Sequence, residues 1–199
     1  KFETGVKENN SQWYATAFLQ DDWSINKQFS VIAGLRCDYH EKYGTNLTPK
    51  ASVMYKIFPF TVRFNYARGY RSPSIKELYM NWDHLGMFWI YGNSKLKPET
   101  NNYISLSGEY VNSWININAN VYSNWFRNKI EGMWSNDQTE LHYINIGKSR
   151  LAGVETMCKI QINRHINVHG AYNYLYTSKD ADGVRLSSSS PHSGNIRAE

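Results

Sequence analysis

The stretch VIAGLRCDYH, residues 31–40, alternates apolar and polar residues with a period of two. One side carries Val31, Ala33, Leu35, Cys37 and Tyr39, and the other carries Ile32, Gly34, Arg36, Asp38 and His40. This pattern is typical of a β-strand with one apolar and one mostly polar face. We therefore predict a strand whose two faces meet different surroundings.

The same period recurs along the chain, for example in SWININANVYSNW (residues 113–125) and GVETMCKIQI (residues 153–162). The strands that it predicts are long, at about ten residues, whereas strands of soluble sheets typically have about five or six. Eight strands are expected, at Gln12–Ile25, Phe29–Glu41, Asn46–Ile57, Phe60–Gly69, Asn101–Val111, Trp114–Asn128, Ile144–Ile162 and His165–Ser178. A ninth strand is expected to begin near His192.

The connections between these strands alternate in length. Short turns are expected near Ile25, Phe58, Asn112 and Arg164, and longer stretches at residues 40–50, 68–100, 127–150 and 177–193. The strands therefore run up and down, with tight turns at one end of the sheet and long loops at the other.

Composition restricts the class of protein further. Of the 199 residues, 41% are hydrophobic and the mean hydropathy is −0.60, which argues against a deep aliphatic core. No apolar run approaches the roughly 18 residues that a membrane-spanning helix needs. The net charge of +5 comes from scattered residues, so a nucleic-acid partner is not expected. Cys37 and Cys158 are distant in sequence, and we expect two unpaired thiols.

A soluble β-sandwich would also alternate, but its strands would be shorter and its loops less unequal. Inside a lipid bilayer every backbone polar group must be paired within the protein, and a closed sheet satisfies this requirement. We predict an all-β fold, an antiparallel up-and-down transmembrane β-barrel, with the apolar face toward lipid and the polar face inward.

Four segments, in this order along the chain, resemble those of TonB-dependent outer-membrane receptors. They are GLRCDYH (residues 34–40), ARGYRSPSIKELY (67–79), GNSKLKPET (92–100) with the strand after it, and INIGKSRLAGVE (144–155). The family-motif positions are Arg71, Pro73, Glu77, Leu78, Tyr79, Asn93, Leu96, Lys97, Pro98 and Glu99.

The resemblance implies a barrel of about 22 strands around an N-terminal plug, located in the outer membrane of a Gram-negative cell. It implies uptake of a scarce nutrient, with the TonB complex acting through the plug. We expect residues 1–199 to be an internal or C-terminal-half piece of that barrel, lacking the plug. Arg68, Arg71, Lys97 and Glu99 are candidates for a charged network at the extracellular rim.

The stretch from Ser74 to Leu96 is the candidate cargo loop, because it does not alternate and it concentrates aromatic residues. The segment is most similar to the haem-uptake branch, which has a histidine between two sequence boxes; here that histidine is His84. A neutral imidazole can ligate haem iron, and aromatic rings can contact a porphyrin face. The candidate cargo-binding residues are His84, Trp82, Phe88, Trp89 and Tyr91. Both boxes depart from the family pattern, and cobalamin, a ferric siderophore or a glycan stay open as cargo.

Other chemistry is not expected. His165 and His169 would lie about 13 Å apart on a strand and could not share a metal ion. Neither Asp21–Asp22 nor Asp180 with Asp182 has the setting of a catalytic acid pair. The serines at 187–190 have no nucleophile-elbow pattern. The chain is thus not predicted to be an enzyme and no resident cofactor or metal is expected; the alternative function is an outer-membrane barrel enzyme, a protease or an acyl hydrolase.

Overall fold

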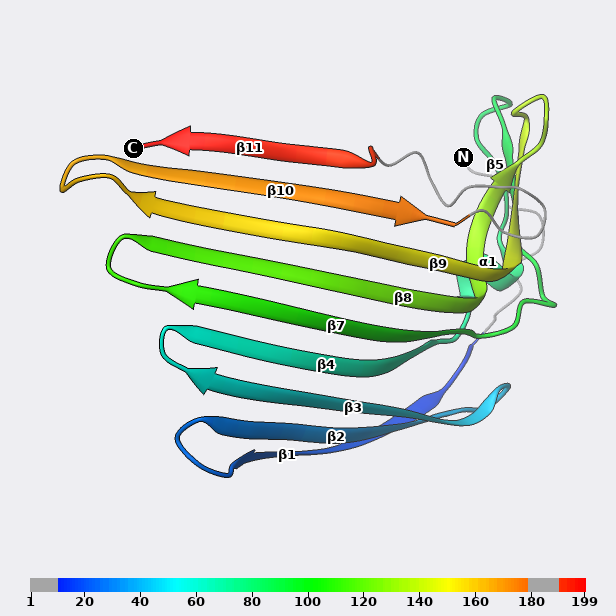
Figure 1. Ribbon diagram of the computed structural model, residues 1–199. Coiled ribbons are helices and arrows are strands. Elements are labelled where there is room, and N and C mark those ends of the chain that lie inside the picture. Colours follow the sequence, from blue (N-terminus) through cyan, green and yellow to red (C-terminus); the bar gives the residue numbers. More distant parts are fainter. Residues whose placement is uncertain (1–10, 179–189) are drawn as a thin grey trace.

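Backbone hydrogen bonds join nine long strands into one antiparallel sheet in the computed structural model, which describes residues 11–178 and 190–199 (Figure 1). The strand order is β1-β2-β3-β4-β7-β8-β9-β10-β11, so each strand pairs with the next long strand along the chain. These strands are β1 (Tyr14–Ser24), β2 (Phe29–His40), β3 (Gly44–Ile57), β4 (Phe60–Arg71), β7 (Glu99–Val111), β8 (Ile115–Trp134), β9 (Glu140–Gln161), β10 (Asn167–Thr177) and β11 (His192–Ala198). The predicted all-β, up-and-down architecture is confirmed.

Three smaller elements lie between β4 and β7. They are α1 (Ile75–Tyr79), β5 (Asn81–Asp83) and β6 (Trp89–Tyr91). β5 pairs with β6, and β6 pairs in parallel with β9. No helix among the described residues is both long and apolar enough to span a bilayer.

The two faces of the sheet differ as the alternation predicts. The strand register places an apolar row across six strands, made of Val53, Phe64, Leu106, Val121, Val154 and Tyr174. The residues next to these in each strand form a polar row on the opposite face. In this row the Ser52 hydroxyl donates to Asn65 Oδ1 at 2.7 Å, and Asn65 Nδ2 donates to Ser105 Oγ at 3.0 Å. The apolar row is therefore suited to lipid and the polar row to a wet interior.

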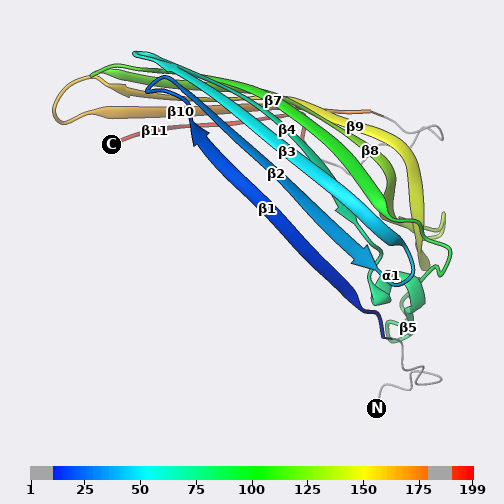
Figure 2. The ribbon, with the colours of Figure 1, turned by 90° about the horizontal axis from the view of Figure 1, so that it is seen from below.

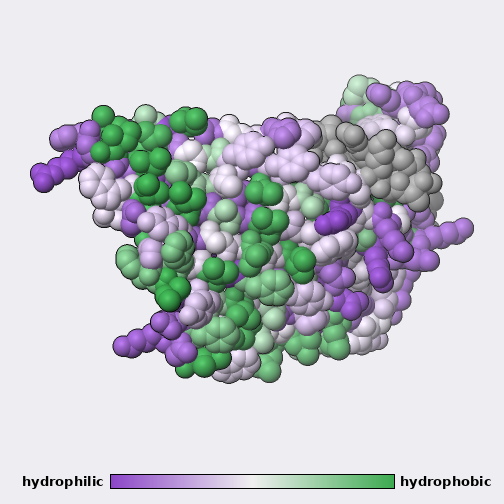
Figure 3. All heavy atoms as spheres, viewed as in Figure 1, coloured by the Kyte–Doolittle hydropathy of each residue, from purple (hydrophilic) through white to green (hydrophobic). Residues whose placement is uncertain are grey.

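The sheet is curved, and α1 and β5 lie on its concave side at the long-loop end (Figures 1 and 2). On the opposite face, hydrophobic side chains gather over the middle and the short-turn end of the strands, whereas the long-loop end is more hydrophilic (Figure 3). We therefore assign the convex face to lipid and the concave face to the barrel interior.

Aromatic residues border the apolar region of the convex face at both ends. At the short-turn end Phe60 lies opposite Tyr110, with ring centroids 5.1 Å apart. At the long-loop end the register brings Tyr66 and Tyr176 into one row, and Trp125 lies one row further along. Two aromatic belts around an apolar band are typical of the two membrane–water interfaces of a transmembrane barrel.

Several predicted boundaries were wrong. Residues 40–50 do not form a long loop, because β2 and β3 pair up to His40 and Gly44. Residues 127–150 are mostly strand, since β8 and β9 stay paired up to Trp134 and Leu141, where mixed polarity conceals the period of two. β10 begins at Asn167, so His165 lies in the preceding turn.

The prediction of two unpaired thiols is confirmed. Cys37 and Cys158 are free thiols on β2 and β9. Within residues 11–178 and 190–199, no group of three or more His, Cys, Asp or Glu side chains is placed to hold a metal ion. Asp180, Asp182 and Ser187–Ser189 lie outside the described residues.

Candidate functional site

The predicted cargo loop folds into a small unit, the cap, which we define as residues 72–98 together with the paired ends of β8 and β9 from residue 129 to residue 146. Its core contains Leu78, Leu96 and Ile130, each no more than 6% exposed, with Tyr143 packed against them. Pro73 is also fully buried. The motif residues Pro73, Leu78 and Leu96 thus supply the apolar centre of the cap.

A charged cluster connects the cap to the sheet. Arg71 at the end of β4 donates from Nη1 to both carboxylate oxygens of Glu77, at 2.9 and 3.0 Å, and from Nη2 to Glu99 Oε2 at 3.2 Å. Glu99 Oε2 also accepts from the Ile130 backbone N–H at 3.0 Å. Arg71 therefore joins β4, α1 and β7, and Glu99 extends the connection to β8.

Glu77 also caps α1. The Ser74 N–H donates to Glu77 Oε2 at 2.8 Å, and the Glu77 N–H donates to Ser74 Oγ at 3.3 Å, which is the reciprocal pattern of a capping box. Burial alone would raise the pKa of the Glu77 carboxyl, but the hydrogen bonds from Ser74 and Arg71 outweigh it and lower this pKa below its ordinary value.

The motif segment at residues 92–100 is held by hydrogen bonds between side chains and backbone groups. Asn93 Nδ2 donates to the Tyr143 carbonyl at 3.0 Å, and the Lys97 N–H donates to Asn145 Oδ1 at 2.8 Å. A Cβ at Gly92 would lie 2.7 Å from the backbone nitrogens of Tyr79 and Met80, so the chain passes too close here for any larger residue. The motif therefore fixes the cap on the sheet.

The predicted charged network at the rim forms only in part. Arg71 and Glu99 belong to it, and Glu77 joins them. Lys97 contributes backbone groups, and its side chain forms no ion pair with the described residues. Arg68 lies on the other face of β4, because the side chain of Asn101 covers the neighbouring Gly69 on the concave side. The remaining motif residue Tyr79 is partly exposed beside Lys42, and Pro98 directly precedes β7.

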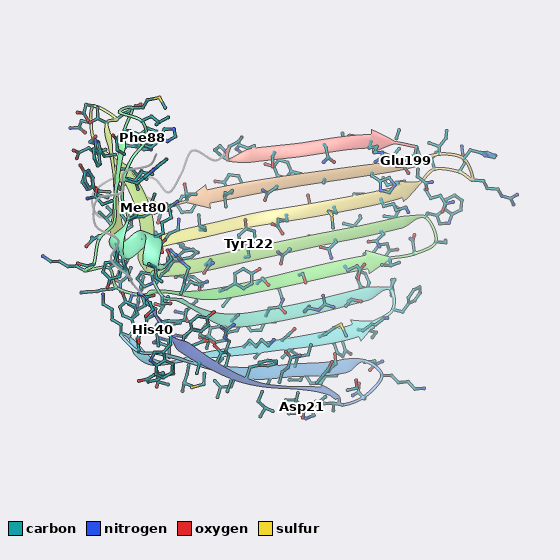
Figure 4. The ribbon with its side chains drawn as sticks, turned by 180° about the vertical axis from the view of Figure 1, so that it is seen from behind. Asp21, His40, Met80, Phe88, Tyr122 and Glu199 are labelled. Atoms are coloured by element: carbon teal, nitrogen blue, oxygen red, sulfur yellow. The ribbon has the colours of Figure 1, made fainter. Side chains whose placement is uncertain are left out.

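The five predicted cargo residues form two separate aromatic clusters. In the first, the His84 ring lies between Trp82 and Phe88, with both centroid distances 4.7 Å, and Phe88 contacts Trp134 at 5.1 Å. The Nδ1 atom of His84 is buried and has no hydrogen-bond partner in the described part of the chain. Phe88 lies farther from α1 than Met80 does, at the opposite end of the cap (Figure 4).

The second cluster, which we call the aromatic ladder, contains Trp89, Tyr91 and His142. Trp89 and Tyr91 stack at 5.9 Å with an interplanar angle of 10°, and Tyr91 and His142 at 5.0 Å and 18°. The parallel pairing of β6 with β9 places Tyr91 opposite His142. Ile90, which lies between Trp89 and Tyr91 in the sequence, is buried. His142 Nε2 lies 2.8 Å from Glu140 Oε2.

The ladder offers an exposed row of flat rings on a hydrogen-bonded support. Trp89 is 40% exposed and His142 is exposed, so both rings are accessible from outside the cap. Sequence analysis missed Trp134, Glu140 and His142, because it assigned residues 127–150 to an irregular loop. The alternation of Glu140 and His142 around Leu141 was the signal that could have identified them.

Comparisons with known proteins identify the family. The family model "TonB dependent receptor-like, beta-barrel" matches residues 4–199. The chain belongs to this family. The family is one of receptors of the outer membrane, so the receptor prediction is confirmed at this level, and the outer-membrane enzyme is not supported.

Three similar proteins illustrate the match. The chain is 26% identical to the iron-regulated outer membrane virulence protein of Vibrio cholerae over 90% of its own length and 29% of that protein. It is 30% identical to the vitamin B12 transporter of Vibrio cholerae over 77% of its length and 23% of that protein. The crystal structure of a siderophore receptor from Acinetobacter baumannii superimposes with a TM-score of 0.74 at 21% identity, covering 92% of this chain and 30% of that one. The chain thus spans less than a third of these proteins.

Proposed function

We propose that the whole protein takes up a scarce, metal-bearing nutrient across the outer membrane, drawing energy through the TonB complex. The observation that carries the proposal is the cap, a firmly anchored unit at the long-loop end of a receptor barrel that exposes aromatic rings. Relatives whose names refer to iron regulation and vitamin B12 support a metal-bearing cargo. TonB acts on the rest of the receptor in this proposal, and the described strands supply the barrel wall.

For the cargo, we favour an iron complex that carries planar aromatic groups, such as a ferric siderophore. The aromatic ladder supports this class because stacked, partly exposed rings bind flat π surfaces. The Glu140–His142 pair beside the ladder adds polar atoms that can accept or donate hydrogen bonds.

Haem is the second candidate, and His84 is the residue that favours it. Its unpartnered Nδ1 has the chemistry of an iron ligand, but this atom is buried between the rings of Trp82 and Phe88. Ligation through Nδ1 therefore requires the first cluster to open, whereas binding at the aromatic ladder requires no rearrangement of the cap.

The full-length receptor in detergent provides the test. A ferric siderophore, cobalamin and haemin are titrated separately against the parent and two variants, Tyr91→Ala and His84→Ala, with tryptophan fluorescence and the haem absorption spectrum as readouts. If the siderophore proposal holds, Tyr91→Ala weakens siderophore binding about tenfold, because it removes the middle ring of the aromatic ladder, whose stacking contacts with Trp89 and His142 are worth about 0.5–1.5 kcal/mol each and hold the exposed rings in place. His84→Ala should leave siderophore binding within about twofold of the parent.

Haemin titration separates the two candidates. A shift of the haem absorption spectrum that disappears in His84→Ala would establish haem and overturn the siderophore assignment. Trp114→Ala, at the short-turn end of β8, is the matched aromatic control and should bind like the parent. Siderophore-dependent growth that persists without TonB would contradict the energy source that we propose.

A further inference from the structure

A cluster of three basic side chains, the basic patch, lies on the convex face at the long-loop ends of β8 and β9. It contains Arg127, Lys148 and Arg150, all exposed. Arg127 pairs directly with Lys148, and Arg150 lies two residues further along β9. The three side chains line one groove together with Trp125, Asn102 and Ser178.

The register shows that this patch faces lipid rather than the barrel interior. Arg127 and Trp125 share the face of Val121 because alternate residues of a strand point the same way. The partner of Trp125 across the ladder is Arg150. Arg150 therefore lies in the row of Trp125, at the aromatic belt. Arg127 and Lys148 lie one row further from the apolar band.

The patch is not neutralised by the residues that surround it. None of its three cations forms an ion pair with an acidic side chain in the described parts of the chain. Two like charges directly opposite each other on neighbouring strands destabilise a sheet. The pairing of Arg127 with Lys148 is therefore unfavourable by itself and becomes favourable when an anion lies between the two side chains.

One member of the patch is already held in place. Arg150 Nε donates to Ser123 Oγ at 2.8 Å, and its guanidinium carbon lies 5.2 Å from the centroid of the Trp125 ring. These contacts use one of the five guanidinium N–H groups, so four remain for an external acceptor. A fixed guanidinium is well suited to phosphate, which it can bind through two parallel hydrogen bonds.

We propose that the basic patch binds the phosphate of an anionic lipid in the leaflet on the long-loop side of the membrane. The position decides between possible anions: polar head groups begin at the aromatic belt, and the patch lies on the outward surface at that level. A soluble anion or an acidic protein would have to approach through the head-group layer. This inference does not depend on the cargo that the receptor carries.

The test uses the full-length receptor in nanodiscs of zwitterionic lipid, with diphosphorylated lipid A as the probe. The triple variant Arg127→Gln, Lys148→Gln, Arg150→Gln should lower the affinity for lipid A at least about tenfold, because each basic residue near an anionic lipid surface contributes measurably to binding. The control triple Lys50→Gln, Arg63→Gln, Lys159→Gln removes the same charge from the concave face. It should bind lipid A within about twofold of the parent, since these positions do not face lipid.

Two further arms identify the anion. Lipid A without its phosphates should bind the parent no better than it binds the triple variant, and millimolar inorganic phosphate should not displace lipid A. Equal affinity of the parent and the triple variant would overturn the proposal, as would displacement by inorganic phosphate, which would indicate a small-anion site. If the triple variant does not insert, Lys148→Gln alone replaces it, with an expected loss of about three- to fivefold.

Discussion

The sheet and the cap are built by different rules, although they share two strands. Among the described residues, the sheet outside the cap has almost no buried apolar residues, because its apolar side chains face outward and polar side chains such as Asn65 and Ser105 face the interior. The cap is organised like a small soluble domain, with Leu78, Leu96 and Ile130 inside and polar groups around them. Surrounding lipid stabilises the first arrangement and exclusion of water the second.

If this distinction holds, a cavity in the cap should loosen the cap and leave the sheet intact. Leu78→Ala removes a side chain that is only 2% exposed, and such truncations cost about 2–5 kcal/mol. We expect α1 amides to lose hydrogen-exchange protection while those of β7 and β8 keep theirs. Leu85→Ala, at a residue that is 78% exposed, is the control and should change neither. Equal loss of protection in the sheet would show that the two regions fold as one unit.

A charge placed on the lipid face should destabilise the sheet rather than the cap. Val121→Arg lies near the middle of the apolar band and should cost about 2–4 kcal/mol in a bilayer, whereas Ile117→Arg, in the row of the short-turn aromatic belt, should cost less. Asn120→Arg on the concave face should be milder still, since Glu155 lies opposite. Denaturant titration of the full-length receptor in vesicles measures all three. Equal costs at residues 120 and 121 would mean that the faces are assigned wrongly.

The charged cluster joins the two regions, and weakening it should separate them partially. Glu77→Gln removes the charge that Arg71 contacts and should cost the cap about 1.5–3 kcal/mol, the usual value of a hydrogen bond to a charged group. Limited proteolysis within residues 72–98 should become faster. The control is Lys76→Gln, at an exposed residue of the same helix. In this variant, cleavage within residues 72–98 should proceed at the parental rate.

Acid should produce a smaller, reversible form of the same change. The folded pKa of Glu77 is below its ordinary value, so ionised Glu77 stabilises the cap. This contribution is complete above the ordinary carboxyl pKa of about 4.3 and is lost as the pH falls through the lower folded value. Hydrogen exchange of α1 should therefore increase only below about pH 4.3, after correction for the intrinsic pH dependence of exchange. A Glu77→Gln variant that shows the same increase would assign it to another group.

The sequence predicted the sheet well because alternation is a local property. Residues 31–40 and 153–162 each contain enough repeats to define both faces without knowledge of their neighbours. Alternation is a weaker guide where the strands leave the apolar band. Beyond Asn128, which has a φ of 54°, β8 no longer needs an apolar side. Its pairing with β9 therefore continues without the alternating pattern.

The candidate site was predicted only as a list of residues. Their division into two clusters depends on the parallel pairing of β6 with β9, a contact between distant segments that no local pattern indicates. The same pairing brings His142 to Tyr91, so the stacking of these two rings could not be predicted from the local alternation around Leu141. Arg71 and Glu77, in contrast, are six residues apart in one motif segment, so their ion pair forms between residues that are close in sequence.

The parallel pairing of β6 with β9 also constrains the order in which the protein assembles. Asn93 meets Tyr143, fifty residues later in the chain, and between them lie all of β7 and β8. Closing a connection of this length is entropically costly unless the intervening chain is already compact. We therefore expect the β7–β8 and β8–β9 hairpins to form before residues 72–98 dock on them, so the aromatic ladder is completed only after this part of the wall is in place.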